Sequence, residues 1–111
     1  MTSFEFGDVV LVPFPFTDQS TTKKRPAIVV SSQTYNSERP DVIIMAVTSQ
    51  IRPANNFDIP VTDWQAAGLL KPSVVKPVIA TVEKVLVIKQ LGRLSEKDQR
   101  TLAESLKAIL R

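Results

Sequence analysis

The apolar residues of this chain come in short runs, and the length of those runs constrains the fold most. Residues 9–12, 27–30 and 42–47 are three such runs, rich in valine and isoleucine and bounded by polar or turn-forming stretches. Uninterrupted runs of this length and composition are typical of strands buried on both faces. Together with further short runs between residues 57 and 94, they predict a mainly β fold, in which bent antiparallel strands close into a small barrel.

The second half of the chain contains weaker strand patterns and one clear helix. Residues 57–61 alternate as a short exposed strand, and residues 62–68 predict one helical turn that stops at Gly68. Residues 73–76 predict a strand broken by Pro77, and residues 78–82 either continue this strand or start another. Further short strands are predicted over 85–88 and 91–94. Residues 31–40 are polar and predict a plain connection.

A helix is predicted from Ser95 to the end of the sequence. Ser95 with Asp98 three residues later fits the looser form of a capping box. An apolar stripe then recurs at helical spacing, formed by Leu102, Leu106, Ile109 and Leu110. We expect this helix to cover the barrel or a partner, and we expect residues 1–111 to form a single domain.

Composition excludes several kinds of chemistry. The sequence has no cysteine and no histidine, which removes disulfides, thiolate catalysis, histidine bases and the usual zinc sites. We therefore expect no cofactor and no metal. The net charge of +3 is compatible with nucleic-acid binding without requiring it. No apolar run reaches the roughly 20 residues of a membrane span, and the start lacks a secretion signal, so we expect a cytoplasmic protein without membrane contact.

The most informative polar stretch is Lys23-Lys24-Arg25-Pro26, which runs directly into the second apolar block. Pro26 suits the first residue of a strand and biases Arg25 toward an extended conformation. A guanidinium would then be fixed at its base with a free head and other cations around it. The alternative interpretation is a solvated basic loop that enters a strand.

Other candidate residues lie in two places. Phe14 and Phe16 alternate with prolines, and they are either core residues or a stacking surface for nucleobases. Thr48, Ser49 and Gln50 end the third apolar run and supply hydroxyl and amide donors.

These residues together resemble the MazF/PemK family of toxin endoribonucleases. The likeness starts with residues 7–18 and with Lys24-Arg25-Pro26-Ala27-Ile28-Val29-Val30-Ser31. It continues through residues 47–50, 70–76 and 91–95 and the final helix, so it covers nearly the whole chain. The ordered set is specific, whereas an isolated Arg-Pro pair would carry no weight.

The resemblance implies an SH3-like barrel, a homodimer and metal-independent cleavage of single-stranded RNA. It also implies a cognate acidic antitoxin as partner, and binding of operator DNA through the antitoxin complex. It assigns catalysis to Arg25 and Thr48, with Ser49 beside them, and it assigns a substrate-binding cation to Lys76. Lys23, Lys24, Phe14, Phe16 and Gln50 complete the substrate-binding residues that we expect.

The general base stays open at this point. Ser20, Pro77 and Val78 occupy positions where relatives use carboxylates. Asp18 is our first candidate, although an aspartate in such a loop equally serves as a turn residue. Two other functions remain possible: a nucleic-acid-binding barrel without activity, and a toxin of the same fold that acts on a topoisomerase by protein contact.

Overall fold

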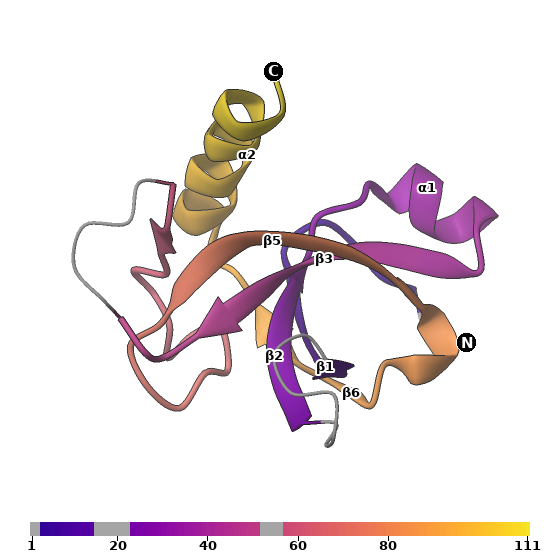
Figure 1. The fold of residues 1–111 in the computed structure, drawn as a ribbon, viewed down its shortest axis with the longest axis horizontal. Helices are drawn as coiled ribbons and strands as arrows, with labels where there is room; N and C mark the ends of the chain where they lie inside the picture. Colours follow the sequence, from indigo (N-terminus) through magenta and orange to yellow (C-terminus); the bar gives the residue numbers. More distant parts are fainter. Residues whose placement is uncertain (1–2, 15–22, 52–56) are drawn as a thin grey trace.

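The computed structural model describes residues 3–14, 23–51 and 57–111. The elements in chain order are β1 (Asp8–Phe14), β2 (Lys23–Val29), α1 (Gln33–Glu38), β3 (Asp41–Thr48), β4 (Ile59–Pro60), β5 (Val74–Glu83), the 3₁₀ helix η1 (Lys84–Leu86), β6 (Lys89–Arg93) and α2 (Glu96–Leu110). The strands form one antiparallel sheet in the order β4-β5-β3-β2-β1-β6. Figure 1 shows the sheet curled on itself, with β5 arched along its length. This curled half-barrel with a C-terminal helix confirms the predicted fold class.

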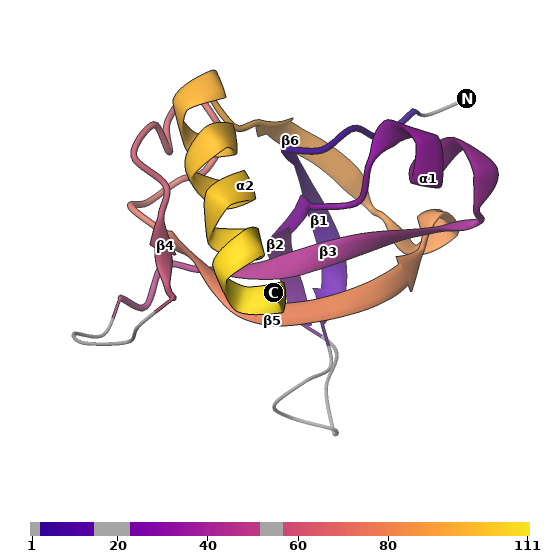
Figure 2. The ribbon, with the colours of Figure 1, turned by 90° about the horizontal axis from the view of Figure 1, so that it is seen from above.

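The central strands are buried on both faces because successive side chains enter two different apolar clusters. Val9 and Ile28 belong to a cluster that also contains Leu102 of α2, whereas Val10 and Ala27 belong to a second cluster with Phe4. This burial confirms what the uninterrupted apolar runs predicted. The two helices lie toward opposite ends of the molecule, as Figure 2 shows from above.

β2 begins earlier than predicted. It starts at Lys23, because residues 23–26 pair with β1, where Arg25 faces Val12 and Pro26 faces Leu11. The ladder to β3 begins only at Ala27. The backbone N–H of Val30 donates to the carbonyl of Ile43 on β3 at 2.8 Å. Alternate residues of a strand direct their backbone nitrogens to the same neighbouring strand, so the nitrogen of Pro26 also points toward β3. A proline has no N–H to donate, and the β2–β3 ladder ends there.

β5 is a single strand that continues through Pro77, so residues 78–82 continue the strand, which was one of the two predicted alternatives. The register shifts at this point: residues 76–78 lie between Val75 and Ile79, whereas only Ala46 lies between their partners on β3. Pro77 therefore lies in a β-bulge, where its missing N–H removes no regular ladder bond.

Three further expectations differ from the structure. Residues 33–38 form the short helix α1, which Ser32 caps by accepting from the N–H of Tyr35 at 3.2 Å. Residues 85–88 form no strand, since η1 covers part of them and Val85 is exposed. The short strand predicted near residues 57–61 is β4, and its Ile59 is buried rather than exposed.

The helix α2 is confirmed, with a different use of its capping box. Ser95 accepts from the N–H of Asp98 at 3.2 Å, as predicted. The Asp98 carboxylate does not reach back to Ser95; it accepts from the backbone N–H groups of Thr62 at 3.2 Å and Asp63 at 2.9 Å. Leu102 is fully buried, whereas Leu110 is exposed and does not continue the apolar contact. α2 is thereby tied to the turn that precedes β5.

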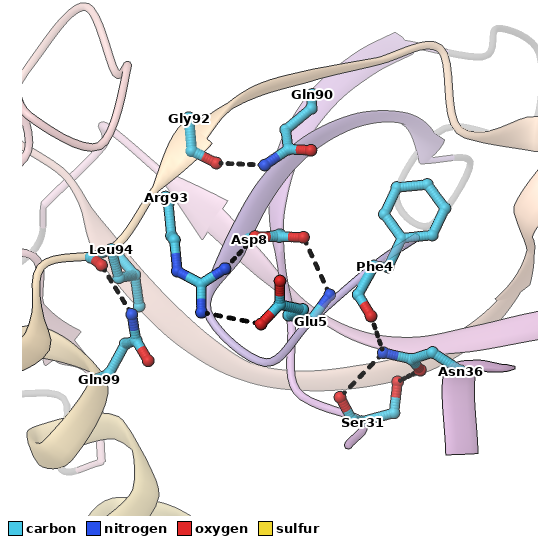
Figure 3. Close-up of polar contacts among 10 residues, drawn as sticks. All are labelled: Phe4, Glu5, Asp8, Ser31, Asn36, Gln90, Gly92, Arg93, Leu94 and Gln99. Atoms are coloured by element: carbon cyan, nitrogen blue, oxygen red, sulfur yellow. Dashed lines mark hydrogen bonds and ion pairs between the residues drawn. The ribbon is translucent and has the colours of Figure 1, made fainter. Parts of the chain in front are cut away.

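Polar contacts attach the N-terminal segment to β6 and to α1 (Figure 3). Arg93 of β6 forms ion pairs with Asp8 at 3.2 Å and with Glu5 at 3.4 Å. Asn36 of α1 is buried and donates to the carbonyls of Phe4 and Ser31. Burial raises the pKa of the Asp8 carboxyl above its ordinary value, although Arg93 and the N–H of Glu5 act in the opposite direction.

Candidate active site

A cavity of about 680 Å³ opens where β2 and β3 diverge. It is lined by parts of β1, β2 and β6, by the end of β3, and by the segment before β5. The lining residues are Leu11, Lys23, Lys24, Arg25, Pro26, Val47, Thr48, Ser49, Gln50, Gly68, Leu69, Leu70, Lys71, Ser73, Lys89 and Leu91. Six residues that the sequence singled out are therefore brought together: Lys23, Lys24, Arg25, Thr48, Ser49 and Gln50.

The apolar part of the cavity wall continues the hydrophobic core. Val47 and Leu69 line the cavity and are buried members of the core cluster that α2 covers. Leu91 packs against the same cluster, from a position where β6 is bulged relative to β1. Packed strands and core residues thus support the polar side chains of this site.

The strand register explains why Arg25 and Thr48 meet. In the β2–β3 ladder, Ala27 pairs with Ala46, Ile28 with Met45 and Val29 with Ile44. Two more steps of the same register place Arg25 across from Thr48. Because Pro26 ends the ladder between them, the strands are not closed by hydrogen bonds here, and both residues line the cavity.

The hydroxyl group of Thr48 is oriented by a local turn. Its oxygen accepts from the backbone N–H of Gln50 at 3.1 Å, the pattern of a threonine turn. This bond uses an acceptor of the hydroxyl and leaves its hydrogen available as a donor. A neutral donor is therefore fixed at the strand end beside Arg25.

The electrostatic character of the cavity is cationic. Arg25 is joined by four lysines, namely Lys23, Lys24, Lys71 and Lys89, and no carboxylate is among the lining residues in the described part of the chain. Lys23 and Lys24 are exposed, whereas Arg25 is half-buried. Clustered cations in a concave site raise the local concentration of anionic ligands such as phosphodiesters.

Comparison with known proteins assigns the family. Residues 5–110 match the family model described as "PemK-like, MazF-like toxin of type II toxin-antitoxin system". The chain belongs to this toxin family. No curated protein sequence matches the toxin at a significant level.

Solved structures with the same fold cover nearly the whole toxin. The Mycobacterium tuberculosis toxin MazF-mt6 is 20% identical, with a TM-score of 0.76 over 93% of this chain and 95% of that chain. A MazE–MazF structure from Deinococcus radiodurans is 19% identical, with a TM-score of 0.78 over 98% of this chain and 97% of that chain. A mycobacterial endoribonuclease in complex with its cognate antitoxin is 17% identical, with a TM-score of 0.76 over 99% and 95%. At these identities the likeness shows the fold.

Not every expected site residue of the toxin reaches the cavity. Lys76 is absent from the lining; its ammonium group forms an ion pair with Asp58 at 3.2 Å, and both residues are half-buried. Phe16 and Asp18 lie outside the described residues, and for Phe14 only the backbone in β1 is described. The roles assigned to these four residues stay predictions.

Two cations were missed from the sequence. Lys71 follows an exposed leucine in a loop, and Lys89 begins β6 after η1. Neither lies in a motif, and both reach the site only through the curl of the sheet and the turn before β5. The resemblance covered residues 70–76, which was the available hint for Lys71.

The described part of the toxin has two further negative features. No three carboxylates there lie close enough together to hold a metal ion. Across residues 3–14, 23–51 and 57–111, no helix has both the length and the apolar character needed to cross a membrane.

Proposed function

We propose that this toxin is an endoribonuclease that cleaves single-stranded RNA at short sequences without a metal ion. The observation that carries the proposal is the cavity in which Arg25 and Thr48 face a common space among four lysines. RNA offers such a site its own nucleophile, because the 2′-hydroxyl can attack the adjacent phosphate.

We assign to Arg25 the binding of the RNA phosphate at which cleavage occurs. A planar guanidinium with several donors can bind two phosphoryl oxygens at once, and its charge compensates the negative charge that builds up in the phosphorane. Thr48 and Ser49 add neutral donors from the strand end. A single fixed donor of this kind contributes about 10²–10³ in rate. The lysines at the rim hold the flanking phosphates.

The reaction requires two proton transfers. A bond forms between the 2′-oxygen and phosphorus, the bond from phosphorus to the 5′-oxygen breaks, and the products are a 2′,3′-cyclic phosphate and a 5′-hydroxyl. A base takes the proton of the 2′-hydroxyl, and an acid supplies a proton to the 5′-oxygen. Asp18 remains our candidate for the base.

The partners follow from the family and from charge. We propose a cognate acidic antitoxin whose carboxylates compete with RNA for the cationic cavity. We also propose a homodimer, the commonest symmetric assembly, which binds operator DNA through the antitoxin complex in the cytoplasm. The binding of RNA and the binding of the antitoxin to the cationic cavity should both weaken as the salt concentration is raised.

The test is cleavage of a labelled single-stranded RNA by purified toxin in EDTA. We expect fragments with a 5′-hydroxyl and a cyclic or opened 3′-phosphate. A matched oligonucleotide with 2′-deoxyribose at the cut position should remain intact because its nucleophile is missing. Equal cleavage of both substrates would contradict the mechanism. Tight RNA binding without any cleavage would instead indicate the inactive binding barrel.

A further inference from the structure

Leu70 is an unusual residue for its position. It lines the cavity, yet 93% of its surface is exposed, so it contributes nothing to the core. Its neighbour Lys71 also lines the cavity and is exposed. We propose that Leu70 and Lys71 form a prearranged nucleotide subsite, in which Leu70 packs on a nucleobase and Lys71 binds the adjacent phosphate. This inference rests on the proposed function, since it names a specificity-determining contact for the same RNA.

The segment that carries this pair is fixed against β6 by two glycines. Gly68 has a φ of +84°, and a Cβ there would lie 2.1 Å from the carbonyl oxygen of Leu91. A Cβ on Gly92 would lie 2.3 Å from the carbonyl oxygen of Ala67. The two backbones therefore touch directly, and only glycine permits this approach. Leu70 follows two residues after this contact.

Hydrogen bonds fix the same segment on either side of Leu70. Before it, the N–H of Leu69 donates to the carbonyl of Trp64 at 3.0 Å. After it, the buried Ser73 hydroxyl donates to the carbonyl of Lys71 at 2.8 Å, and the carbonyl of Ser73 accepts from Val61 at 3.0 Å. The leucine is thus exposed on a segment whose backbone is held at both ends.

Asp98 anchors the start of this segment. Only 4% of its surface is exposed, and its two carboxylate oxygens accept the N–H groups of Thr62 and Asp63. A buried carboxylate that binds two backbone donors is costly to place unless both bonds are made. The bonds connect α2, which packs on the core, with the segment that ends at the cavity rim.

A fixed, exposed apolar side chain beside a cation matches the chemistry of a nucleotide. Every base has an apolar face that gains from contact with a side chain, and leucine is one of the residues that proteins insert against bases. Because the backbone is fixed beforehand, little entropy is lost when the base binds. The lysine supplies the charge that the neighbouring phosphodiester requires.

The experiment compares Leu70→Ala with Leu110→Ala. Leu110 is 65% exposed at the end of α2 and does not line the cavity, so it offers the same chemical change elsewhere. With single-stranded RNA, Leu70→Ala should raise KM about five- to tenfold with kcat within about twofold of wild type, a loss at the low end of that for base stacking. The preference for the base at one position near the cut should also weaken. Leu110→Ala should leave both unchanged.

Binding of a 2′-deoxy oligonucleotide separates this inference from the proposed function. If the wild type binds but does not cleave RNA, the proposed function fails, and a lower affinity of Leu70→Ala for the oligonucleotide still supports the subsite. Lys71→Ala should reduce the slope of log affinity against log salt by about 0.7, the value for one phosphate on a single strand. Unchanged KM, preference and oligonucleotide affinity in Leu70→Ala would overturn the proposal. So would a variant that loses affinity only for an antitoxin, because Leu70 would then be a protein contact.

Discussion

Removing the Asp98 carboxylate should lower the free energy of unfolding of the toxin, because this one group accepts two backbone hydrogen bonds. In Asp98→Ala, the backbone N–H groups of Thr62 and Asp63 both lose their acceptor. The N–H of residue 98 still donates to the Ser95 hydroxyl oxygen, because residue 98 contributes only its backbone to this bond. The measured effect therefore reports the link between α2 and the turn before β5.

The magnitude follows from two charge-assisted hydrogen bonds. Each contributes about 1.5–3 kcal/mol when its donor is left without a partner, and we take about 1–2 kcal/mol because water reaches this partly buried turn. The expected loss is thus about 2–4 kcal/mol. With an unfolding entropy of about 2.1 cal/mol/K per residue over 111 residues, the melting temperature should fall by about 9–17 °C.

Thermal and urea unfolding of three variants tests this reasoning. Asp63→Ala removes an exposed carboxylate next to the same turn and should change the free energy of unfolding by less than about 0.5 kcal/mol. Asp98→Asn keeps one acceptor but turns an NH₂ group toward the other N–H, so about half of the loss should remain. A melting temperature of Asp98→Ala within about 2 °C of wild type would refute the argument that these two bonds hold the turn.

Three further predictions concern separate parts of the molecule. Arg25→Ala should lower the RNA cleavage rate about 10²–10³-fold in a folded protein, and Arg25→Lys should recover little of it; near-normal activity would remove Arg25 from the mechanism. Gly92→Ala should destabilise by about 1–3 kcal/mol, because its Cβ would meet the Ala67 carbonyl at 2.3 Å; chemical denaturation measures this, and an unchanged midpoint would contradict the close contact. Burial raises the pKa of Asp8, so the native state keeps the Asp8 carboxyl protonated to a higher pH than the unfolded state does. The contribution of Asp8 to the free energy of unfolding therefore falls as pH rises from about 3.8 through the raised pKa. The free energy of unfolding of the wild type minus that of Asp8→Asn should decrease as pH rises across that window. An increase with pH would contradict a raised pKa of Asp8.

The strands could be predicted because their information is local, whereas Arg25 and Thr48 became candidate catalytic residues through the resemblance to the toxin family. Uninterrupted apolar runs specify strands buried on both faces, and the Arg25-Pro26 pair marks where one ladder must end. The position of Thr48 follows once that register is known. These features depend on residues within one strand or one strand pair.

What could not be predicted depends on contacts between distant segments. From the sequence, a strand either stops at Pro77 or continues through it, and only the bulge opposite Ala46 decides between the two. Asp98 looks like half of a capping box, because the N–H groups of Thr62 and Asp63 that it binds lie more than thirty residues earlier. Lys89 becomes a cavity residue only when β6 joins the edge of β1.

The pairing of β1 with β6 has a consequence for the order of events during synthesis. A ribosome releases β1, β2 and β3 first, so Arg25 and Thr48 emerge long before Lys89 and Asp98. The cavity wall from β6 and the anchored rim can form only after the last quarter of the chain has emerged. A nascent toxin therefore holds Arg25 and Thr48 in an incomplete cavity. If the cavity cleaves RNA as proposed, the ribosome has already read past the codons of Lys89 and Asp98 before the product can cut any transcript, including its own.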